Sequence, residues 1–362
     1  MKVLLLEPWF GGSHRAWAEG YVRHSAHRVE LLTLPAQFWK WRMQGAAVSM
    51  ARVVRERGTQ TDIVLASGMM NVATFRALAS CPAPLALYLH ENQLTYPQNA
   101  RQRHGWQYGF VNYISALAAD RVFFNSAWHR DVFLEELPRM LRHFGDFNEE
   151  DSVEGIREKA GVLAPGMELR RHDRFRPSTQ EGRKAPLILW NHRWDEDKNP
   201  PLFLDALQTL AADGVPFRVA LAGANLRREP REFEAARASL GARIVQYGHV
   251  DDEEDYSRLL WSADYVVSAA WQDFFGMAVV EAMYCKCVPV LPQRLNYPHL
   301  VPPDLHAQCL YRRNRLAPLL LRHLNGQFEV DSDRLRAHVL QFDWEIQAPL
   351  MDRALEHLAG QA

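Results

Sequence analysis

Short apolar runs alternate with longer amphipathic stretches along the whole chain. Each run is only four or five residues long, and the stretches between them show the apolar spacing of helices, as after Ser13 and around residues 72–79. This alternation is typical of a parallel sheet covered by helices on both faces. The first half is therefore predicted to be one doubly wound α/β unit, with strands at residues 3–6, 63–66, 85–89 and 122–125.

A polar, basic and turn-rich segment at residues 170–184 interrupts this pattern, and we interpret it as a linker. We therefore expect an α/β protein of two Rossmann-like domains, residues 1–175 and 176–344, with a C-terminal helix at 345–362 packing back on the first. Ligands of such sheets bind beyond the carboxyl ends of the strands, here in a central cleft between facing domains. The second unit is predicted to have strands at residues 187–190, 218–222, 243–247, 265–268 and 288–291.

Composition excludes several classes of protein. The 42 Lys and Arg nearly balance the 43 Asp and Glu, so any polyanionic partner must be met by local patches. Four scattered cysteines are too few for a disulfide scaffold in a chain of 362 residues, and a reduced, cytoplasmic setting is expected. No apolar stretch approaches the roughly 20 residues of a membrane span, so we expect no membrane partner.

The first motif, residues 7–14, follows the first expected strand and contains Gly11 and Gly12. Paired glycines let the backbone approach a ligand closely, and the following helix N-terminus offers N–H groups to a phosphate. The alternative is an ordinary strand-to-helix turn with Ser13 as the N-cap. The Gly pair alone favours that alternative.

The second motif, residues 190–200, follows the first strand of the second unit. Arg193 and Lys198 can clamp a diphosphate and neutralise it as it departs. A solvated charged loop is the alternative. We take the neighbouring Trp190 and Trp194 as evidence for a ligand site, because solvated loops seldom carry two indoles.

The third motif, residues 273–283, places Asp273 in a loop and Glu281 inside the helix that follows. The N–H groups of Phe275, Gly276 and Met277 can face a phosphate. A helix N-terminus capped by an Asp is an equally good interpretation. The two carboxylates are not an evident acid–base pair.

The fourth motif, residues 89–97, ends another strand in a cluster of His, Glu, Asn and Gln side chains. Such groups are poor core material, because each would need a buried partner. A site that faces a ligand is the better interpretation, and a hydrogen-bonded loop is the alternative. The chain shows no metal-binding spacing, so we expect no metal, no catalytic metal ion and no cofactor besides substrates.

These motifs resemble those of the GT-B, family-4-like glycosyltransferases. The Gly pair, the Arg and Lys pair, the Gly-His-Val turn that ends at Val250, and the Asp-Phe-Phe-Gly segment with its later Glu are all in place. The blocks at 9–14, 33–42 and 107–109 and the His-Glu-Asn-Gln-Leu-Thr-Tyr-Pro block at 90–97 resemble more specifically the tRNA-queuosine mannosyltransferases. Two positions differ from the usual pattern: Asp273 stands where Glu is common, and His299 where an acidic residue is common.

The resemblance implies a retaining enzyme that transfers mannose from GDP-mannose to queuosine in a tRNA anticodon, without a metal. Its donor partner would be a nucleotide sugar and its acceptor partner a queuosine-containing tRNA. The implied catalytic residues are Arg193, Lys198, His90 and Asp273. The implied donor-binding residues are Gly11, Gly12, Val250, Phe275, Gly276, Met277 and Glu281, and the acceptor-binding residues are His14, Trp39, Trp41, Arg42, Glu91, Asn92 and Tyr96.

Two other functions remain open from the sequence. A GT-B enzyme with a lipid or saccharide acceptor would share every donor motif. A non-catalytic tRNA-binding protein could keep the fold, although intact Arg193, Lys198 and Glu281 argue against it. Basic and aromatic residues that could stack on and contact an unstacked RNA loop favour the tRNA acceptor: Trp39, Trp41, Arg42, Arg101, Arg103, His104 and Trp106.

Overall fold

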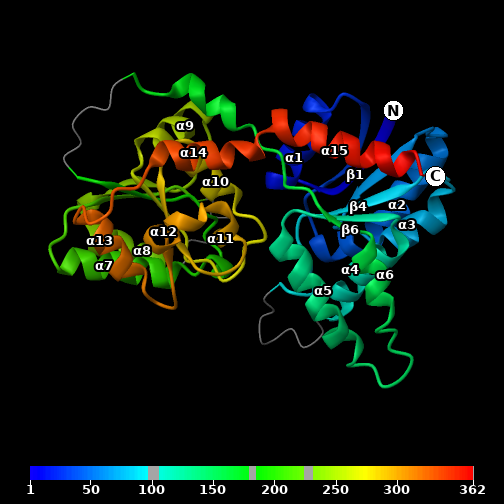
Figure 1. The fold of residues 1–362 in the computed structure, drawn as a ribbon, viewed down its shortest axis with the longest axis horizontal. Helices are drawn as coiled ribbons and strands as arrows, with labels where there is room; N and C mark the ends of the chain where they lie inside the picture. The colour runs from blue at the N-terminus through cyan, green and yellow to red at the C-terminus, as the bar shows by residue number, and fades with distance from the viewer. Residues whose placement is uncertain (97–105, 179–184, 224–230, 362) are drawn as a thin grey trace. The chain divides into compact units, whose positions relative to one another are not determined.

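The protein is described here from a computed structural model, which covers residues 1–96, 106–178, 185–223 and 231–361. It contains two compact units, one formed by residues 1–168 with 342–362 and the other by residues 169–341 (Figure 1). Each unit is built on a six-stranded parallel sheet. The predicted pair of doubly wound α/β units is therefore confirmed.

In the N-terminal unit the strand order is β2-β1-β3-β4-β5-β6. Alternate residues of β1 enter different cores, because successive side chains of a strand point to opposite faces: Leu4 and Leu6 join one core, and Val3 and Leu5 the other. Both faces of the sheet are thus buried. The strands are β1 (Lys2–Phe10), β2 (Arg28–Pro35), β3 (Ile63–Ser67), β4 (Leu85–Leu89), β5 (Arg121–Phe124) and β6 (Ala160–Val162).

Helices cover both faces of this sheet. The C-terminal helix α15 (Trp344–Ala359) packs beside α1 (Gly12–His24), where Trp344 and Leu355 complete the core that Val3 and Leu5 enter. Figure 1 shows this red helix against the blue start of the chain. The other face is covered by helices that include α2 (Trp39–Arg57), α3 (Val72–Ala79), α4 (Trp106–Ala118), α5 (Ala127–Leu141) and α6 (Ser152–Glu158).

In the C-terminal unit the strand order is β12-β11-β10-β7-β8-β9. β7 and β10 are neighbours at its centre, where the strand order reverses, which is the usual place for a ligand in such sheets. The strands are β7 (Leu187–Trp190), β8 (Arg218–Leu221), β9 (Ile244–Tyr247), β10 (Tyr265–Val267), β11 (Val288–Pro292) and β12 (Leu310–Tyr311). The helices are α7 (Pro200–Ala212), α8 (Arg231–Leu240), α9 (Glu253–Ser262), α10 (Met277–Tyr284), α11 (Tyr297–Leu300), α12 (His306–Cys309), α13 (Leu316–Leu324) and α14 (Ser332–Val339).

The segment interpreted as a linker begins with an ordered 3-10 helix, η1 (Leu169–Phe175), that packs on α9. The ring of His172 is buried and lies 2.8 Å from the hydroxyl of Ser257, and its carbonyl accepts a hydrogen bond from the indole of Trp261. The boundary expected after residue 175 is therefore too late, and the division falls after Glu168. Residues 179–184 of the expected linker lie outside the described residues.

None of the helices within the described ranges is long and apolar enough to cross a lipid bilayer.

Candidate functional site

The loop after β7 carries the predicted phosphate clamp. The side chain of Arg193 is 48% exposed, and its guanidinium lies 2.7 Å from the carboxylate of Asp195. Lys198 ends the short 3-10 helix η2 (Glu196–Lys198) and is buried. The two cationic groups thus differ: an incoming phosphate would compete with Asp195 for Arg193, whereas Lys198 is held inside the loop.

The two indoles of this loop belong to the core. Trp190 is fully buried and stacks on Phe203 with ring centroids 4.5 Å apart, and Trp194 stacks on Phe233 at 4.1 Å. Our use of Trp190 and Trp194 as evidence for a ligand site was therefore wrong. Their contribution is to anchor both ends of the segment that carries Arg193.

Lys198 joins the loops that follow β7 and β10. Its ammonium donates a hydrogen bond to the carbonyl of Gln272 at 2.8 Å and lies 3.4 Å from the carboxylate of Asp197 and 3.5 Å from that of Asp273. Lys198 is buried, and the side chains of Asp197 and Asp273 are only 11% and 17% exposed, so each charge depends on the others for compensation. The structure thus brings Lys198 and Asp273 together where the strand order reverses.

The charge states around Lys198 follow from this arrangement. Burial opposes ionisation of Asp273, but the Lys198 ammonium and hydrogen bonds from Tyr297 and the Phe275 N–H reverse this and lower the pKa of the carboxyl. Burial also lowers the pKa of His192 to about 4, and the nearby ammonium adds to the effect. At neutral pH the site therefore holds a charged Asp273 and an uncharged His192.

Gly276 ends the turn after Asp273 and precedes α10. Its φ of +102° favours glycine, and a Cβ atom there would lie 2.9 Å from the side chain of Leu300 and 3.2 Å from that of Tyr297. Backbone conformation and space both require glycine. The N–H of Met277 opens α10 and points toward the end where an anion can bind, whereas the N–H of Phe275 donates to Asp273 at 3.3 Å.

Glu281 lies inside α10 and has three partners that the motifs did not identify. The guanidinium of Arg171 lies 2.8 Å from one carboxylate oxygen, the hydroxyl of Tyr256 donates to the other at 3.1 Å, and His172 lies 3.8 Å away. Burial would raise the pKa of Glu281, but the hydrogen bond from His172 and the charge of Arg171 lower it. Tyr256 also accepts a hydrogen bond from Asn191, which ties Glu281 to the loop after β7.

The sequence missed Arg171 because it falls in the segment interpreted as a linker. Its basic character was visible, but nothing in the local pattern indicated a partner at position 281. Tyr256, in α9, shows no motif either. Only the packing of η1 and α9 against α10 brings these side chains to the carboxylate.

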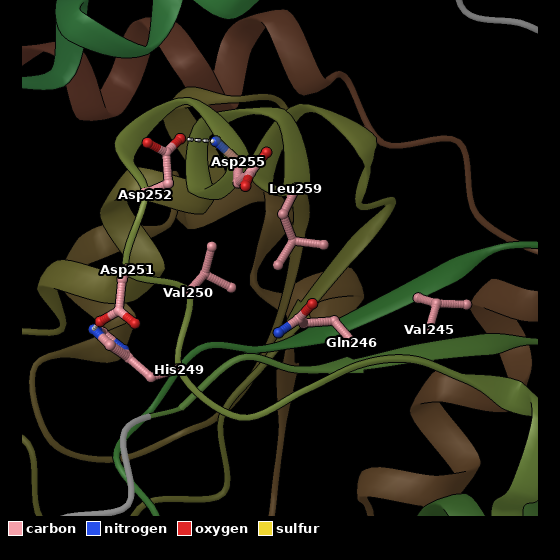
Figure 2. A pocket seen from close by; sticks show the side chains of 8 residues that line it. All are labelled: Val245, Gln246, His249, Val250, Asp251, Asp252, Asp255 and Leu259. Carbon is pink, nitrogen blue, oxygen red and sulfur yellow. Dashed lines mark hydrogen bonds and ion pairs between the residues drawn. The ribbon is translucent and has the colours of Figure 1, made fainter.

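A hollow of about 510 Å³ lies beside Val250, the residue expected near the nucleotide base. Figure 2 shows the side chains that line it, with Asp252 accepting a hydrogen bond from the backbone of Asp255 at the start of α9. The imidazole of His249 lies 3.6 Å from the carboxylate of Asp251. Carboxylates repel a diphosphate, so this hollow suits a group that donates hydrogen bonds.

In the N-terminal unit the Gly pair forms the turn from β1 to α1. A Cβ at Gly11 would lie 2.6 Å from that of Ala36, and Gly12 has a φ of +53° with open space beside it. Gly11 is therefore required by packing and Gly12 by backbone conformation. Gly11, and not Ser13 as the alternative had it, is the N-cap of α1.

A chain of charged groups runs across the carboxyl end of this sheet. Glu7 is fully buried in the second half of β1 and lies 3.2 Å from Nδ1 of His14, whose Nε2 lies 3.1 Å from the carboxylate of Glu91. Burial opposes the charged form of His14, but the two carboxylates outweigh it and raise the pKa of the imidazole well above its usual value. Only Glu91 is partly exposed, at 23% of its side chain. Glu7 carried no predicted role.

His90 lies beside this chain in a wall of aromatic rings. Its ring centroid is 4.2 Å from that of His14, 4.6 Å from that of Trp17 and 4.7 Å from that of Tyr88. Burial and the neighbouring His14 lower the pKa of His90 well below its usual value. The structure thus brings together His14, His90 and Glu91, three of the predicted site residues.

Asn92 has a structural part in the same segment. Its side-chain oxygen accepts hydrogen bonds from the backbone N–H groups of Leu94 and Thr95, and the side chain is fully buried. Direct contact of Asn92 with an acceptor does not fit this burial. Tyr96 is half-buried, and Arg101, Arg103 and His104 lie outside the described residues.

The two tryptophans predicted to stack on an acceptor lie at the start of α2 and differ in exposure. Trp39 is partly buried and packs against Tyr108 with ring centroids 5.0 Å apart, whereas Trp41 is 63% exposed. Its indole lies over Gly45, where a Cβ would come within 2.5 Å of the ring. Arg42 donates to the carbonyl of Pro35 at 3.1 Å, which fixes its guanidinium at the start of α2.

Phe38 is a further exposed ring that the sequence did not single out. It is 77% exposed and is held in the left-handed backbone region at φ +53°. Such a conformation is rare for a bulky residue and clusters at functional sites. Phe38 and Trp41 together give this part of α2 an exposed aromatic surface.

Comparison with protein families matches both units. Residues 2–167 match the N-terminal domain of tRNA-queuosine alpha-mannosyltransferase, and residues 172–308 match the glycosyl transferases group 1. The tRNA-queuosine alpha-mannosyltransferase of Drosophila melanogaster is 34% identical over 314 residues, which is 83% of this chain and 82% of the relative. The residues described above at the carboxyl ends of both sheets fall within these matches, except for Arg171.

Solved structures share the fold at low sequence identity. Sucrose-phosphate synthase from Thermosynechococcus elongatus superposes with a TM-score of 0.74 at 14% identity and with full coverage of both chains. A glycosyltransferase from Rickettsia africae ESF-5 has a TM-score of 0.70 at 14% identity, covering 100% of this chain and 99% of the other. These likenesses confirm the GT-B fold class.

Proposed function

The chain belongs to the tRNA-queuosine α-mannosyltransferase family, and from this premise we propose that it transfers mannose from GDP-mannose to queuosine in a tRNA anticodon, with retention at the anomeric carbon. The 34% identity across both units carries the proposal. A glycosyltransferase needs a site for a departing nucleoside diphosphate, and the loops around Lys198 have the charge and position for one.

The donor contacts follow from the C-terminal unit. Arg193, Lys198 and the N–H of Met277 stabilise the diphosphate as negative charge develops on it. Glu281 accepts hydrogen bonds from the ribose hydroxyls, and Asp273, 3.5 Å from Lys198, accepts them from the sugar. Phe275 positions Asp273 through its N–H.

The hollow beside Val250 favours a guanine base. Guanine presents an N–H and an amino group on one edge, and carboxylates are pure acceptors that can bind both. Asp251, Asp252 and Asp255 all line this hollow. We therefore expect GDP to bind more tightly than UDP or ADP.

Leaving-group stabilisation in this proposal comes from the protein and not from a divalent ion. The sugar–phosphate bond breaks as Lys198 and Arg193 neutralise the diphosphate, and the acceptor hydroxyl attacks the same face of the sugar. No side chain forms a covalent bond to the sugar. The hydroxyl proton leaves with the diphosphate, whose oxygens are the nearest base on that face.

The acceptor contacts belong to the N-terminal unit. Exposed Trp41 and Phe38 offer stacking surfaces to unpaired bases, and Arg42 adds a cation beside them. Glu91, His14 and His90 contribute a polar edge at the end of β4, with Gly12 in the loop beside them. Because tRNA modification is an intracellular reaction, we place the enzyme in the cytoplasm.

The direct test compares tRNA carrying queuosine with the same tRNA carrying guanosine. Each is incubated with a panel of nucleotide sugars, and the nucleosides are then measured by mass spectrometry. We expect a hexose to be added to queuosine only, and from GDP-mannose best. Equal transfer to both tRNAs would contradict the acceptor assignment.

The two rival functions give different results in the same experiment. A lipid or saccharide acceptor would leave both tRNAs unmodified while GDP-mannose is still consumed with the right acceptor. A non-catalytic tRNA-binding protein would bind tRNA without binding any nucleotide sugar, as calorimetry would show. The intact Lys198–Asp273 pair argues against the second.

A further inference from the structure

Three potential ligand atoms from separate segments converge in the N-terminal unit. Glu7 Oε2, in the second half of β1, lies 3.2 Å from Nδ1 of His14 in α1 and 3.7 Å from Nε2 of His90 after β4. Among the described residues this is the one grouping of three acidic, His or Cys side chains whose ligand atoms all lie within 4.8 Å of one another. Tetrahedral zinc with bonds of about 2.0–2.1 Å holds its ligand atoms about 3.3 Å apart, which these separations approach.

The atoms behind this grouping are arranged as they are around bound metals. Glu7 Oε1 accepts hydrogen bonds from the N–H of Trp9 and the hydroxyl of Ser67, so this oxygen is fixed and Oε2 faces the two imidazoles. The second ring nitrogen of His14 lies 3.1 Å from the carboxylate of Glu91. A carboxylate bonded to the far nitrogen of a histidine is the usual outer partner of a metal ligand, because it orients the ring and raises its basicity.

His90 supplies an independent observation. Its Nε2 is buried and has no hydrogen-bond partner within the described part of the chain, although buried polar atoms normally have one. The rings of Trp17 and Tyr88 hold the imidazole in place, and its Nε2 is directed to Glu7. A metal ion would satisfy this nitrogen without any change of rotamer.

We propose that Glu7, His14 and His90 bind a divalent transition-metal ion, for which zinc is the best match. Two imidazoles and one carboxylate are a common zinc ligand set, and three protein ligands leave a coordination position for water or a substrate oxygen. The site joins β1, α1 and β4 in the N-terminal unit and is separate from the diphosphate contacts. It departs from the expectation of no metal and does not rest on the proposed function.

The competing occupant is a proton. Without a metal, His14 shares its protons with the two carboxylates, as the 3.2 and 3.1 Å contacts allow. Transfer activity cannot separate these occupants, because either could support it. Metal content and spectroscopy separate them directly.

The experiment uses the full chain without a histidine tag. Metal is measured in the purified protein, removed by a chelator, and replaced by Zn²⁺ in calorimetry and by Co²⁺ in visible absorption spectroscopy. We expect about one equivalent of either ion per chain and a d–d spectrum of low-symmetry nitrogen and oxygen coordination. A folded, chelator-treated protein that binds neither ion would overturn the proposal.

Variants locate the ion. Glu7→Gln and His90→Gln should abolish binding, whereas His129→Gln, at a buried histidine in the same unit and outside the grouping, should retain it. Since these variants could unfold, Glu91→Gln is the milder test: it keeps all three ligands and should weaken Zn²⁺ binding by roughly 10–100-fold. Binding that is unchanged in Glu91→Gln and in folded His90→Gln would show that the ion lies elsewhere and would refute the site.

Discussion

The carboxyl ends of the two sheets carry charges in contrasting arrangements. In the C-terminal unit two cations lie among carboxylates: half-exposed Arg193 is paired with Asp195, and Lys198 lies between Asp197 and Asp273. In the N-terminal unit, the carboxylates of Glu7 and Glu91 surround the imidazole of His14. The same doubly wound frame thus carries an arginine and a lysine among carboxylates at the end of one sheet, and imidazoles between carboxylates at the end of the other.

The contrast teaches that strand-end position alone does not determine ligand chemistry. Both edges lie where the strand order reverses, between β7 and β10 in one unit and between β1 and β3 in the other. What differs is the set of side chains placed there: an arginine and a lysine among carboxylates in one unit, and two histidines among carboxylates in the other. Each prediction below tests one side of this difference.

The largest expected effect is on turnover. Arg193→Ala and Lys198→Ala should each lower it by roughly 10²–10³, because each removes a charge at the departing diphosphate. Steady-state rates with GDP-mannose and queuosine tRNA measure this, and the control is Arg258→Ala, at an exposed arginine paired only with Glu254 of its own helix among the described contacts. Normal rates in both variants would show that the donor diphosphate does not bind at the loops after β7 and β10.

Lys198→Ala should also lower stability, since it leaves the largely shielded carboxylates of Asp197 and Asp273 without their cation. Arg193→Ala should not, because its side chain is half-exposed. Thermal denaturation with circular dichroism separates the two effects.

The next effect concerns the stability contributed by one glycine at the carboxyl end of each sheet. Gly276→Ala should destabilise the protein by roughly 1–3 kcal/mol, because both φ and the space beside Leu300 exclude a Cβ. Gly12→Ala has open space and should cost only about 1 kcal/mol for its φ. The matched control is Gly155→Ala in α6, where a Cβ meets nothing and a gain of roughly 0.5–1 kcal/mol is expected. Equal losses at Gly276 and Gly155 in urea unfolding would contradict the packing argument.

A smaller effect should distinguish the two tryptophans of α2. Trp41→Ala should weaken tRNA binding by about 1–3 kcal/mol and leave thermal stability unchanged, because the indole is exposed. Trp39→Ala should lower stability, because its ring packs against Tyr108 and Met43. Binding is measured by titration with queuosine tRNA, and GDP affinity serves as the control. If Trp41→Ala bound tRNA normally, the acceptor surface would lie elsewhere.

The smallest effect is a slope in the pH dependence of stability. Burial lowers the pKa of His192 from 6.5 to about 4, so below pH 6.5 the unfolded chain takes up a proton that the folded chain does not, and stability falls as the pH falls. Between about pH 6 and 5, the wild type should lose about 1.2 kcal/mol per pH unit more than His192→Gln. His129→Gln should remove a similar slope in the other unit, where burial lowers the pKa to about 3. The free energy of unfolding is measured with urea at each pH. If it changed with pH equally in all three proteins, both assignments would be refuted.

The central strands were predictable because their signals are local. β7 and β10 are continuous apolar runs and β1 contains one at residues 3–6, and Gly12, Arg193 and Asp273 follow these strands within a few positions. Two of the edge strands, β2 and β12, were not among the expected strands. β2 mixes charged and apolar residues because it is only half-buried, and β12 has two residues.

The contacts that span distant segments could not be predicted. Arg171 and Glu281 are 110 positions apart, and Glu91 and His14 are 77 apart. No local period or spacing encodes such pairs, so Glu7 was not recognised and Arg171 was assigned to a linker. The interpretation of Trp190 and Trp194 was wrong because their neighbours along the chain are charged, which suggested a ligand site. Their packing partners, Phe203 in α7 and Phe233 in α8, could not be identified from the local sequence.

Helix α15 determines the order in which this chain can fold during synthesis. The core on one face of the N-terminal sheet contains Trp344, Met351 and Leu355, which leave the ribosome after every residue of the C-terminal unit. That core, with the buried α1 residues Trp17 and Tyr21, must wait for the end of translation, whereas residues 169–341 can already be packed. A nascent chain stalled before position 344 would therefore expose one apolar face of its first sheet, and a chaperone that binds apolar surfaces is expected to associate with it until release.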